Sequence, residues 1–130
     1  MKKQIIMNAL ILKAGENTPS IRLDATKGIF EISGTSRPEN VAIFYKPIMD
    51  WLDEYAQSPN ELTVFDFKLK YFNTASSKII YDIMMKLSDI HRAGKSVTIR
   101  WHYQSGDDDI EDVGKDFSEI VEFPIEMVEY

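Results

Sequence analysis

The stretch LTVFDFKLKYFNTASSK, residues 62–78, decides the fold, because it joins the clearest strand of the chain to the start of a helix. In its first ten residues, polar side chains alternate with apolar ones at Phe65, Phe67, Leu69 and Tyr71, which predicts a strand with one buried and one wet face. Beyond it, apolar residues recur at helical spacing as one stripe: Ile79, Ile80, Ile83, Met84, Leu87 and Ile90. The stretch therefore predicts a strand followed directly by an amphipathic helix.

Periodicity and turn residues predict five further strands. With the first, the expected strands are residues 9–12, 21–24, 28–34, 62–71, 97–103 and 125–128. A first helix opens near 36–40, where Ser36 is a candidate cap, and contains Pro47, which we expect to kink the helix or to break a hydrogen bond. A third helix follows the acidic run 107–112 and ends at Pro124.

The expected order is β-β-β-α-β-α-β-α-β. The two sharpest strands, 62–71 and 97–103, each have one polar face. This pattern favours an α/β fold in which a mixed sheet carries its helices mainly on one face. Residues 1–130 fit a single domain, because this length supports one core.

Composition narrows the class of protein. Hydrophobic residues make up 44% of the chain, which indicates a packed globule, and the absence of cysteine excludes disulfides and thiol chemistry. A net charge of −6 argues against a general nucleic-acid binder. The apolar residues of segment 1–8 are too few for a signal peptide core, and no run reaches membrane-spanning length. We therefore expect a soluble cytoplasmic protein without nucleic-acid or membrane partners.

The usual signatures of chemistry are missing. The chain has no glycine-rich phosphate loop, and His91 and His102 lie on different predicted elements without metal-ligand spacing. The acidic run 107–112 fails as a calcium loop, because Asp112 stands where glycine is required. We interpret it as a solvated loop whose acids favour the next helix start. No cofactor or metal is expected.

One interpretation of the surface stays open. Lys68, Lys70 and Arg100 lie on the wet faces of two strands and form a small basic patch only if those strands are neighbours. A solvated sheet face is the favoured interpretation. Trp51 and Trp101 sit on periodic apolar faces, and we assign both to the core.

The joint 71–78 concentrates hydroxyls at a helix entrance. Thr74 stands where an N-cap is expected, although Asn73 fits that role too and would leave Thr74 in the first turn. A phosphate on Thr74 would lie against the positive end of the helix dipole. Capping and phosphorylation are therefore both compatible with this position. A small hydrolase built on Ser76 or Ser77 is less favoured, because no base and oxyanion set accompanies them.

The segment YFNTASSK, residues 71–78, resembles the signature of the SiaC family of bacterial regulatory phosphoproteins. Other segments agree in order: GTSRPEN at 34–40, FYKP at 44–47, WLDEY at 51–55, and WHY at 101–103 followed by the acids at 107–109. Together they cover nearly the whole chain. Ala75 departs from the pattern, since a second hydroxyl is common there.

The resemblance implies a STAS-like fold and a non-enzymatic signalling role. By position, Thr74 would be phosphorylated by a SiaB-like kinase and dephosphorylated by a SiaA-type phosphatase of the PP2C class. The unphosphorylated protein would bind and activate a diguanylate cyclase, which raises cyclic di-GMP. Asn73, Ser76, Ser77 and Lys78 are the expected partner-binding residues around it. A partner switch with another output, like that of anti-sigma-factor antagonists, is the alternative.

Overall fold

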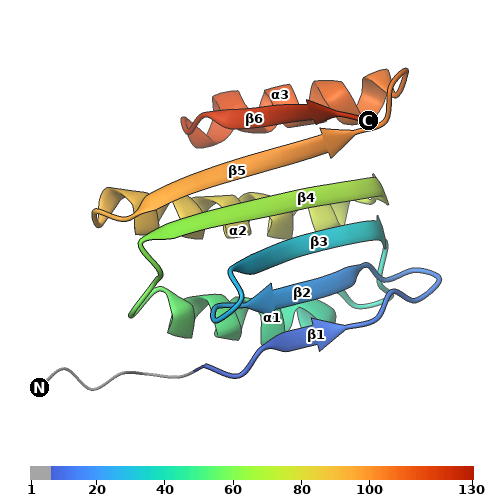
Figure 1. Cartoon of the computed structure of the whole chain (residues 1–130). Helices are drawn as coiled ribbons and strands as arrows, with labels where there is room; N and C mark the ends of the chain where they lie inside the picture. The colour runs from blue at the N-terminus through green and yellow to red at the C-terminus, as the bar shows by residue number, and fades with distance from the viewer. Residues whose placement is uncertain (1–6) are drawn as a thin grey trace, which may run out of the picture.

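Within residues 7–130, which the computed structural model describes, six strands form one mixed sheet in chain order (Figure 1). The segment assessed for a signal peptide core lies largely outside the described residues. The strands are β1 (Leu10–Leu12), β2 (Ser20–Asp24), β3 (Ile29–Ser36), β4 (Leu62–Phe72), β5 (Ser96–Tyr103) and β6 (Ile125–Glu129). The helices are α1 (Val41–Tyr55), α2 (Thr74–Arg92) and α3 (Asp108–Val121). The order β-β-β-α-β-α-β-α-β confirms the prediction.

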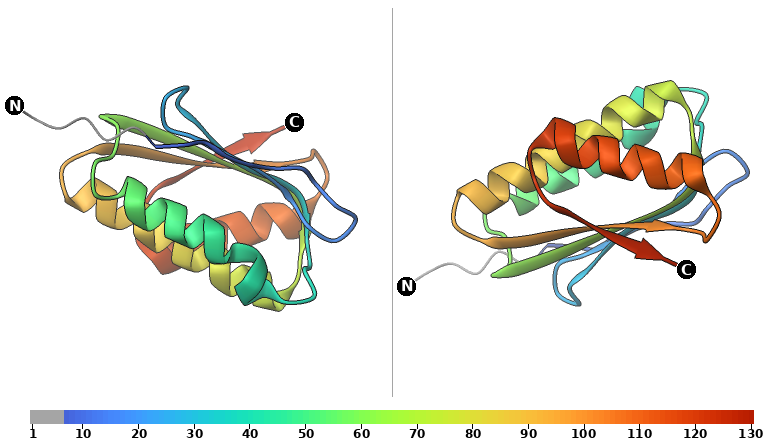
Figure 2. Two further views of the ribbon diagram at one scale, coloured as in Figure 1. Left: turned by 90° about the horizontal axis from the view of Figure 1, so that it is seen from below. Right: turned by 90° about the horizontal axis from the view of Figure 1, so that it is seen from above.

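The sheet changes character along its width. β1, β2 and β3 pair antiparallel, whereas β3, β4, β5 and β6 pair parallel. Each parallel connection carries one helix, and all three helices cover the same face of the sheet (Figure 2). The carboxyl ends of β3, β4 and β5 therefore meet at one edge, where the loops that enter α1, α2 and α3 lie side by side.

The core fills the space between the sheet and the three helices. Trp101 is fully buried, and Trp51 is almost so, which confirms their assignment to the core. Gly114 of α3 faces the Trp101 indole so closely that a Cβ on Gly114 would lie 2.4 Å from Trp101 Cδ1. The helix approaches the sheet at this point because glycine has no side chain.

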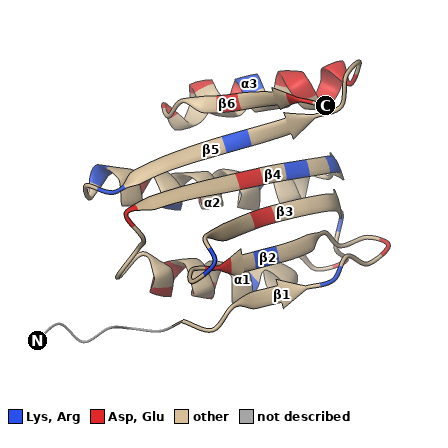
Figure 3. Cartoon of the chain, in the orientation of Figure 1, with Lys and Arg blue, Asp and Glu red and all other residues tan. Residues whose placement is uncertain are grey.

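The other face of the sheet is open and carries charges of both signs (Figure 3). β4 and β5 are neighbours, so the three predicted cations do share this face. Two of them are paired with carboxylates: Lys68 Nζ lies 3.2 Å from Glu31, and Arg100 Nε lies 3.5 Å from Asp66. The face is therefore of mixed charge rather than a continuous basic patch.

One prediction on β4 is wrong. Tyr71 was assigned to the buried face with Phe65 and Phe67, but its side chain is 49% exposed. The register with β3 shifts between Gly34 and Thr35, so β4 has one extra residue at Lys70. This bulge places two successive side chains on the open face and turns Phe72 toward the core, where it contacts Trp101.

The start of the first helix also differs from the prediction. Ser36 is not its cap, because it is the last residue of β3 and is fully buried. Asn40 caps α1 instead, since its Oδ1 accepts a hydrogen bond from Ile43 N at 3.1 Å. Pro47 lies inside α1, as predicted, and the helix continues through it to Tyr55. No helix within residues 7–130 is both long and apolar enough to cross a bilayer.

Candidate phosphoacceptor site

The joint between β4 and α2 is capped by Asn73. Its side-chain Oδ1 accepts a hydrogen bond from Ser76 N at 2.8 Å, and its carbonyl accepts one from Ser77 N at 3.0 Å. The Asn73 backbone is extended, as a cap requires, and α2 begins at Thr74. Of the two interpretations that the sequence leaves open, the structure therefore selects Asn73 as the cap and places Thr74 in the first turn.

Ser76 ties this joint to the interior. It is fully buried, and its Oγ donates to the Ser36 carbonyl at 3.0 Å while accepting from Ser36 Oγ at 2.8 Å. Ser36 Oγ also lies 2.7 Å from the Tyr45 hydroxyl of α1. The oxygens around Ser76 belong to hydroxyls and a carbonyl, so its hydrogen bonds include neither a histidine nor a carboxylate base. The network joins β3, α1 and the start of α2.

Tyr45 in this network stays neutral over a wide pH range. Burial raises the pKa of Tyr45 above its ordinary value, and the hydrogen bond with Ser36 offsets only part of that effect. The neutral phenol keeps its proton, and the hydrogen bond between Tyr45 and Ser36 is retained. The hydrogen-bonded network of Ser36, Tyr45 and Ser76, which we call the support, thus anchors the start of α2.

Thr74 is exposed on top of this support. Within residues 7–130 its side chain makes no hydrogen bond, and neither do the backbone amides of Thr74 and Ala75. Ser77 is half-buried, and Lys78 is exposed and paired with Asp82 at 3.1 Å. Thr74 is therefore a hydroxyl that is accessible from solvent, beside two backbone donors at a helix N-terminus.

A cation from the neighbouring loop lies close to the joint. The Asn73 amide donates to the Ser36 carbonyl at 3.1 Å. Arg37 is the next residue after Ser36 and is therefore held beside the joint. Its guanidinium lies over the Tyr71 ring, 5.7 Å from the centroid, and its Nε donates to Asn17 Oδ1 at 2.8 Å. The sequence pattern assigned Tyr71 to the buried face and gave Arg37 no role, because their contact depends on the bulge in β4.

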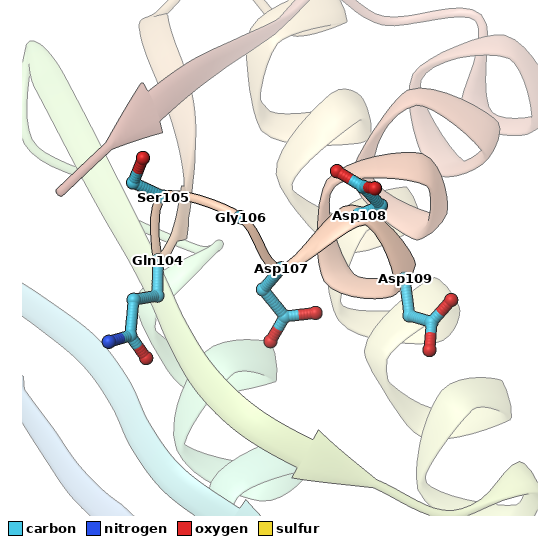
Figure 4. A pocket seen from close by; sticks show the side chains of 6 residues that line it. All are labelled: Gln104, Ser105, Gly106, Asp107, Asp108 and Asp109. Atoms are coloured by element: carbon cyan, nitrogen blue, oxygen red, sulfur yellow. The ribbon is translucent and has the colours of Figure 1, made fainter.

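The third loop at this edge of the sheet is acidic. Residues 104–109 line a hollow of about 550 Å³, and the carboxylates of Asp107, Asp108 and Asp109 point in different directions (Figure 4). Asp107 caps α3 by accepting from Ile110 N at 3.1 Å, and acids fill the first turn. The acids favour the helix start, as predicted, but the run is not a loop that precedes the helix, because α3 already begins at Asp108. Within residues 7–130, no three His, Cys, Asp or Glu side chains gather as a metal would require.

The two histidines are apart, as predicted. His102 is buried on β5, with Nε2 2.7 Å from Asp66 Oδ1. His91 lies in the last turn of α2, with Nδ1 3.2 Å from the Lys95 carbonyl and its ring edge-on to Phe123. Both histidines contact residues of the fold, and none of these contacts involves Thr74.

Comparison with known proteins decides the family. The model of the SiaC family regulatory phosphoproteins matches residues 12–130. The chain belongs to the SiaC family. An uncharacterized protein of Pseudomonas aeruginosa (strain UCBPP-PA14) is 30% identical over 118 residues, which are 91% of this chain and 94% of that relative.

Solved SiaC structures share the fold. The crystal structure of apo-SiaC from Pseudomonas aeruginosa matches with a TM-score of 0.85 and 29% identity, over 94% of this chain and 99% of that one. A chain in the crystal structure of the diguanylate cyclase SiaD in complex with its activator SiaC, from the same species, matches with a TM-score of 0.86 and 28% identity. That match covers 93% of this chain and 99% of that one. The family resemblance and the fold expected from the sequence are thus confirmed.

Proposed function

We propose that this SiaC family protein is a non-enzymatic regulator that binds and activates a diguanylate cyclase while Thr74 is unphosphorylated. The observation that carries the proposal is the exposed Thr74 hydroxyl at the first residue of a capped, internally anchored helix. The SiaC of Pseudomonas aeruginosa, which has the same fold, is the activator of the cyclase SiaD. Partner binding by the related protein supports the same class of partner here.

Phosphorylation of Thr74 changes the surface and leaves the fold intact. Phosphate adds roughly −1.5 to −2 charge, which the helix dipole and the two amides without partners favour. Asn73 and Ser76 hold the helix start without using the Thr74 hydroxyl. A partner that docks on the neutral hydroxyl must desolvate the new charge, and the complex is lost.

The same geometry suits reversible control by two enzymes. A SiaB-like kinase reaches Thr74 because the side chain projects into solvent, and a PP2C-type phosphatase reaches the phosphate for the same reason. Asn73, Ser77 and Lys78 surround Thr74 and complete the contact surface, while Ser76 acts from below as a positioning residue. A cytoplasmic location belongs to the proposal, because the kinase needs ATP.

The test compares cyclase binding by variants of the full chain. The diguanylate cyclases of the source organism are purified and titrated with wild-type protein, Thr74→Ala and Thr74→Glu. We expect one cyclase to bind the wild type and Thr74→Ala alike and to lose affinity for Thr74→Glu. Thr26→Glu is the matched control, because Thr26 is also exposed but lies in the β2–β3 turn at the opposite edge.

Phosphosite mapping on protein from the native cell completes the test. Phosphate on Thr74 supports the proposal, whereas phosphate on other hydroxyls alone, under every growth condition, contradicts the assignment. Equal cyclase affinity of Thr74→Ala and Thr74→Glu rules out the switch. A partner that discriminates between them and is not a cyclase indicates the alternative output.

A further inference from the structure

A hollow of about 320 Å³ lies on the open face of the sheet, which the three helices leave uncovered (Figure 2). Three adjacent strands, β3, β4 and β5, and the residue after β6 line this hollow: Ser33, Lys68, Lys70, His102 and Tyr130. Ser33 of β3 stands directly opposite Lys68 of β4 in the register. The volume is at the lower end of the range in which proteins bind small molecules.

The hollow has one cation whose charge is not matched. Lys68 Nζ lies 3.2 Å from Glu31 Oε2, and His102 Nε2 lies 2.7 Å from Asp66 Oδ1. Both carboxylates beside the lining residues are therefore paired already. Lys70 is exposed, and within residues 7–130 it makes no ion pair. An anion in the hollow would meet this free ammonium.

The bulge in β4 brings Lys70 to this place. Leu69 pairs with Gly34 and Tyr71 pairs with Thr35, so Lys70 has no partner residue on β3. A bulge redirects a side chain, and bulges are common beside functional sites. Lys70 is thus the extra residue of the strand and also a lining residue of the hollow.

The two remaining lining residues hold fixed positions. His102 is only 9% exposed, and its bond to Asp66 fixes the ring. The backbone of Tyr130 is held on both sides, since its amide donates to the Tyr103 carbonyl at 3.0 Å and its carbonyl accepts from Ser105 N at 2.7 Å. The Tyr130 side chain is nevertheless 57% exposed. An aromatic ring on an anchored backbone gains from being covered by a flat apolar group.

We propose that this hollow binds a small phosphomonoester, whose phosphate lies between Lys68 and Lys70 and whose flat ring covers Tyr130. A phosphomonoester carries roughly −1.5 to −2 charge at neutral pH, which suits two ammonium groups better than the single charge of a carboxylate. Lysine binds phosphate as a point charge, and the Ser33 hydroxyl can donate to a phosphate oxygen.

The pair of Lys68 with Glu31 does not prevent binding. The Lys68 side chain is 40% exposed, and ion pairs at such positions contribute little to stability, so Lys68 turns to the ligand at small cost. The inference does not rest on the proposed function, because Thr74 belongs to α2, on the other side of the sheet (Figure 2).

Three small molecules test the ligand class. Phenyl phosphate, inorganic phosphate and benzoate are titrated into the isotope-labelled full chain at constant ionic strength, and binding is followed by NMR. We expect phenyl phosphate to shift the amide signals of the five lining residues. It should bind at least about threefold more tightly than inorganic phosphate, which lacks the ring, and than benzoate, which lacks the second charge.

Three variants locate the site. Lys70→Gln is expected to weaken phenyl phosphate by at least about threefold, whereas Lys27→Gln binds like the wild type. Lys27 is the matched control because it is exposed in the β2–β3 turn and, among the described residues, also makes no ion pair. Tyr130→Ala should bind phenyl phosphate no more tightly than inorganic phosphate. Thermal unfolding checks that all three variants are folded.

Several results would overturn the proposal. Shifts confined to residues 73–77 would place the phosphate at the start of α2 and not on the sheet. Equal weakening by Lys70→Gln and Lys27→Gln would show that the anion responds only to overall charge. Benzoate that binds as tightly as phenyl phosphate would contradict the preference for phosphate, and an unchanged preference for the ring in Tyr130→Ala would contradict its place over Tyr130.

Discussion

The assignment of the α2 cap to Asn73 makes a quantitative prediction about stability. Asn73→Ala removes the acceptor of the 2.8 Å hydrogen bond from Ser76 N and leaves that amide without a partner beside a fully buried side chain. Loss of an N-cap costs about 1 kcal/mol, and burial of the amide raises the cost toward about 2 kcal/mol. Thr74→Ala removes an exposed hydroxyl without a hydrogen bond, and we expect the free energy of unfolding to change by less than about 0.5 kcal/mol.

Urea denaturation of the two variants measures this difference directly. For a chain of 130 residues, the loss in Asn73→Ala corresponds to a melting temperature lower by roughly 4 °C per kcal/mol. Ser77→Ala serves as a control in the same turn. If Thr74→Ala lowers the free energy of unfolding as much as Asn73→Ala does, Thr74 is the cap. The claim that the helix start is stable without the Thr74 hydroxyl is then refuted.

Three further predictions concern the support and the core. Ser76→Ala should lower the free energy of unfolding by about 1–3 kcal/mol in urea denaturation, because the Ser36 hydroxyl and carbonyl each lose a buried partner. A loss below about 0.5 kcal/mol, as is usual for an exposed side chain, would contradict the network. Gly114→Ala should cost about 1–3 kcal/mol and alter the tryptophan fluorescence, since its Cβ overlaps the Trp101 indole; an unchanged melting temperature would show that α3 packs farther from the sheet. Because burial raises the pKa of Tyr45 above the unfolded value of 10.0, the folded state keeps its proton longer and stability falls as the pH rises above about 10. Tyr45→Phe should make the free energy of unfolding fall less steeply with pH. An unchanged slope would show that a group other than Tyr45 causes the fall.

The element order was predictable because alternation and helical periodicity are strong in this chain. The strand 62–71 and the α2 stripe each repeat over several residues, so small errors at their ends do not change the topology. One-sided packing followed from the polar faces of β4 and β5. These features depend on neighbours in the sequence.

The errors arose where distant segments meet. The bulge at Lys70 depends on the register with β3, and without that register Tyr71 continues the buried pattern. Ser36 resembles a helix cap in its own segment, but contacts with Ser76 and Tyr45 place it in the interior. At the candidate site, the sequence predicted the cluster of hydroxyls and left the cap open, because Asn and Thr both belong to the residues that cap helices. The contact of Arg37 with Tyr71 had no signal in either segment, because it depends on the pairing of β3 with β4.

The central claim is that phosphorylation of Thr74 controls partner binding without unfolding the domain. The most direct measurement is the affinity of the purified diguanylate cyclase for the unphosphorylated protein and for protein carrying phosphothreonine at position 74 in full stoichiometry, with the melting temperature of both forms recorded. We predict an affinity at least about tenfold lower for the phosphorylated form, equivalent to about 1.4 kcal/mol, with the melting temperature kept or raised. Equal affinity of the two forms, or loss of binding that accompanies unfolding, would contradict the account.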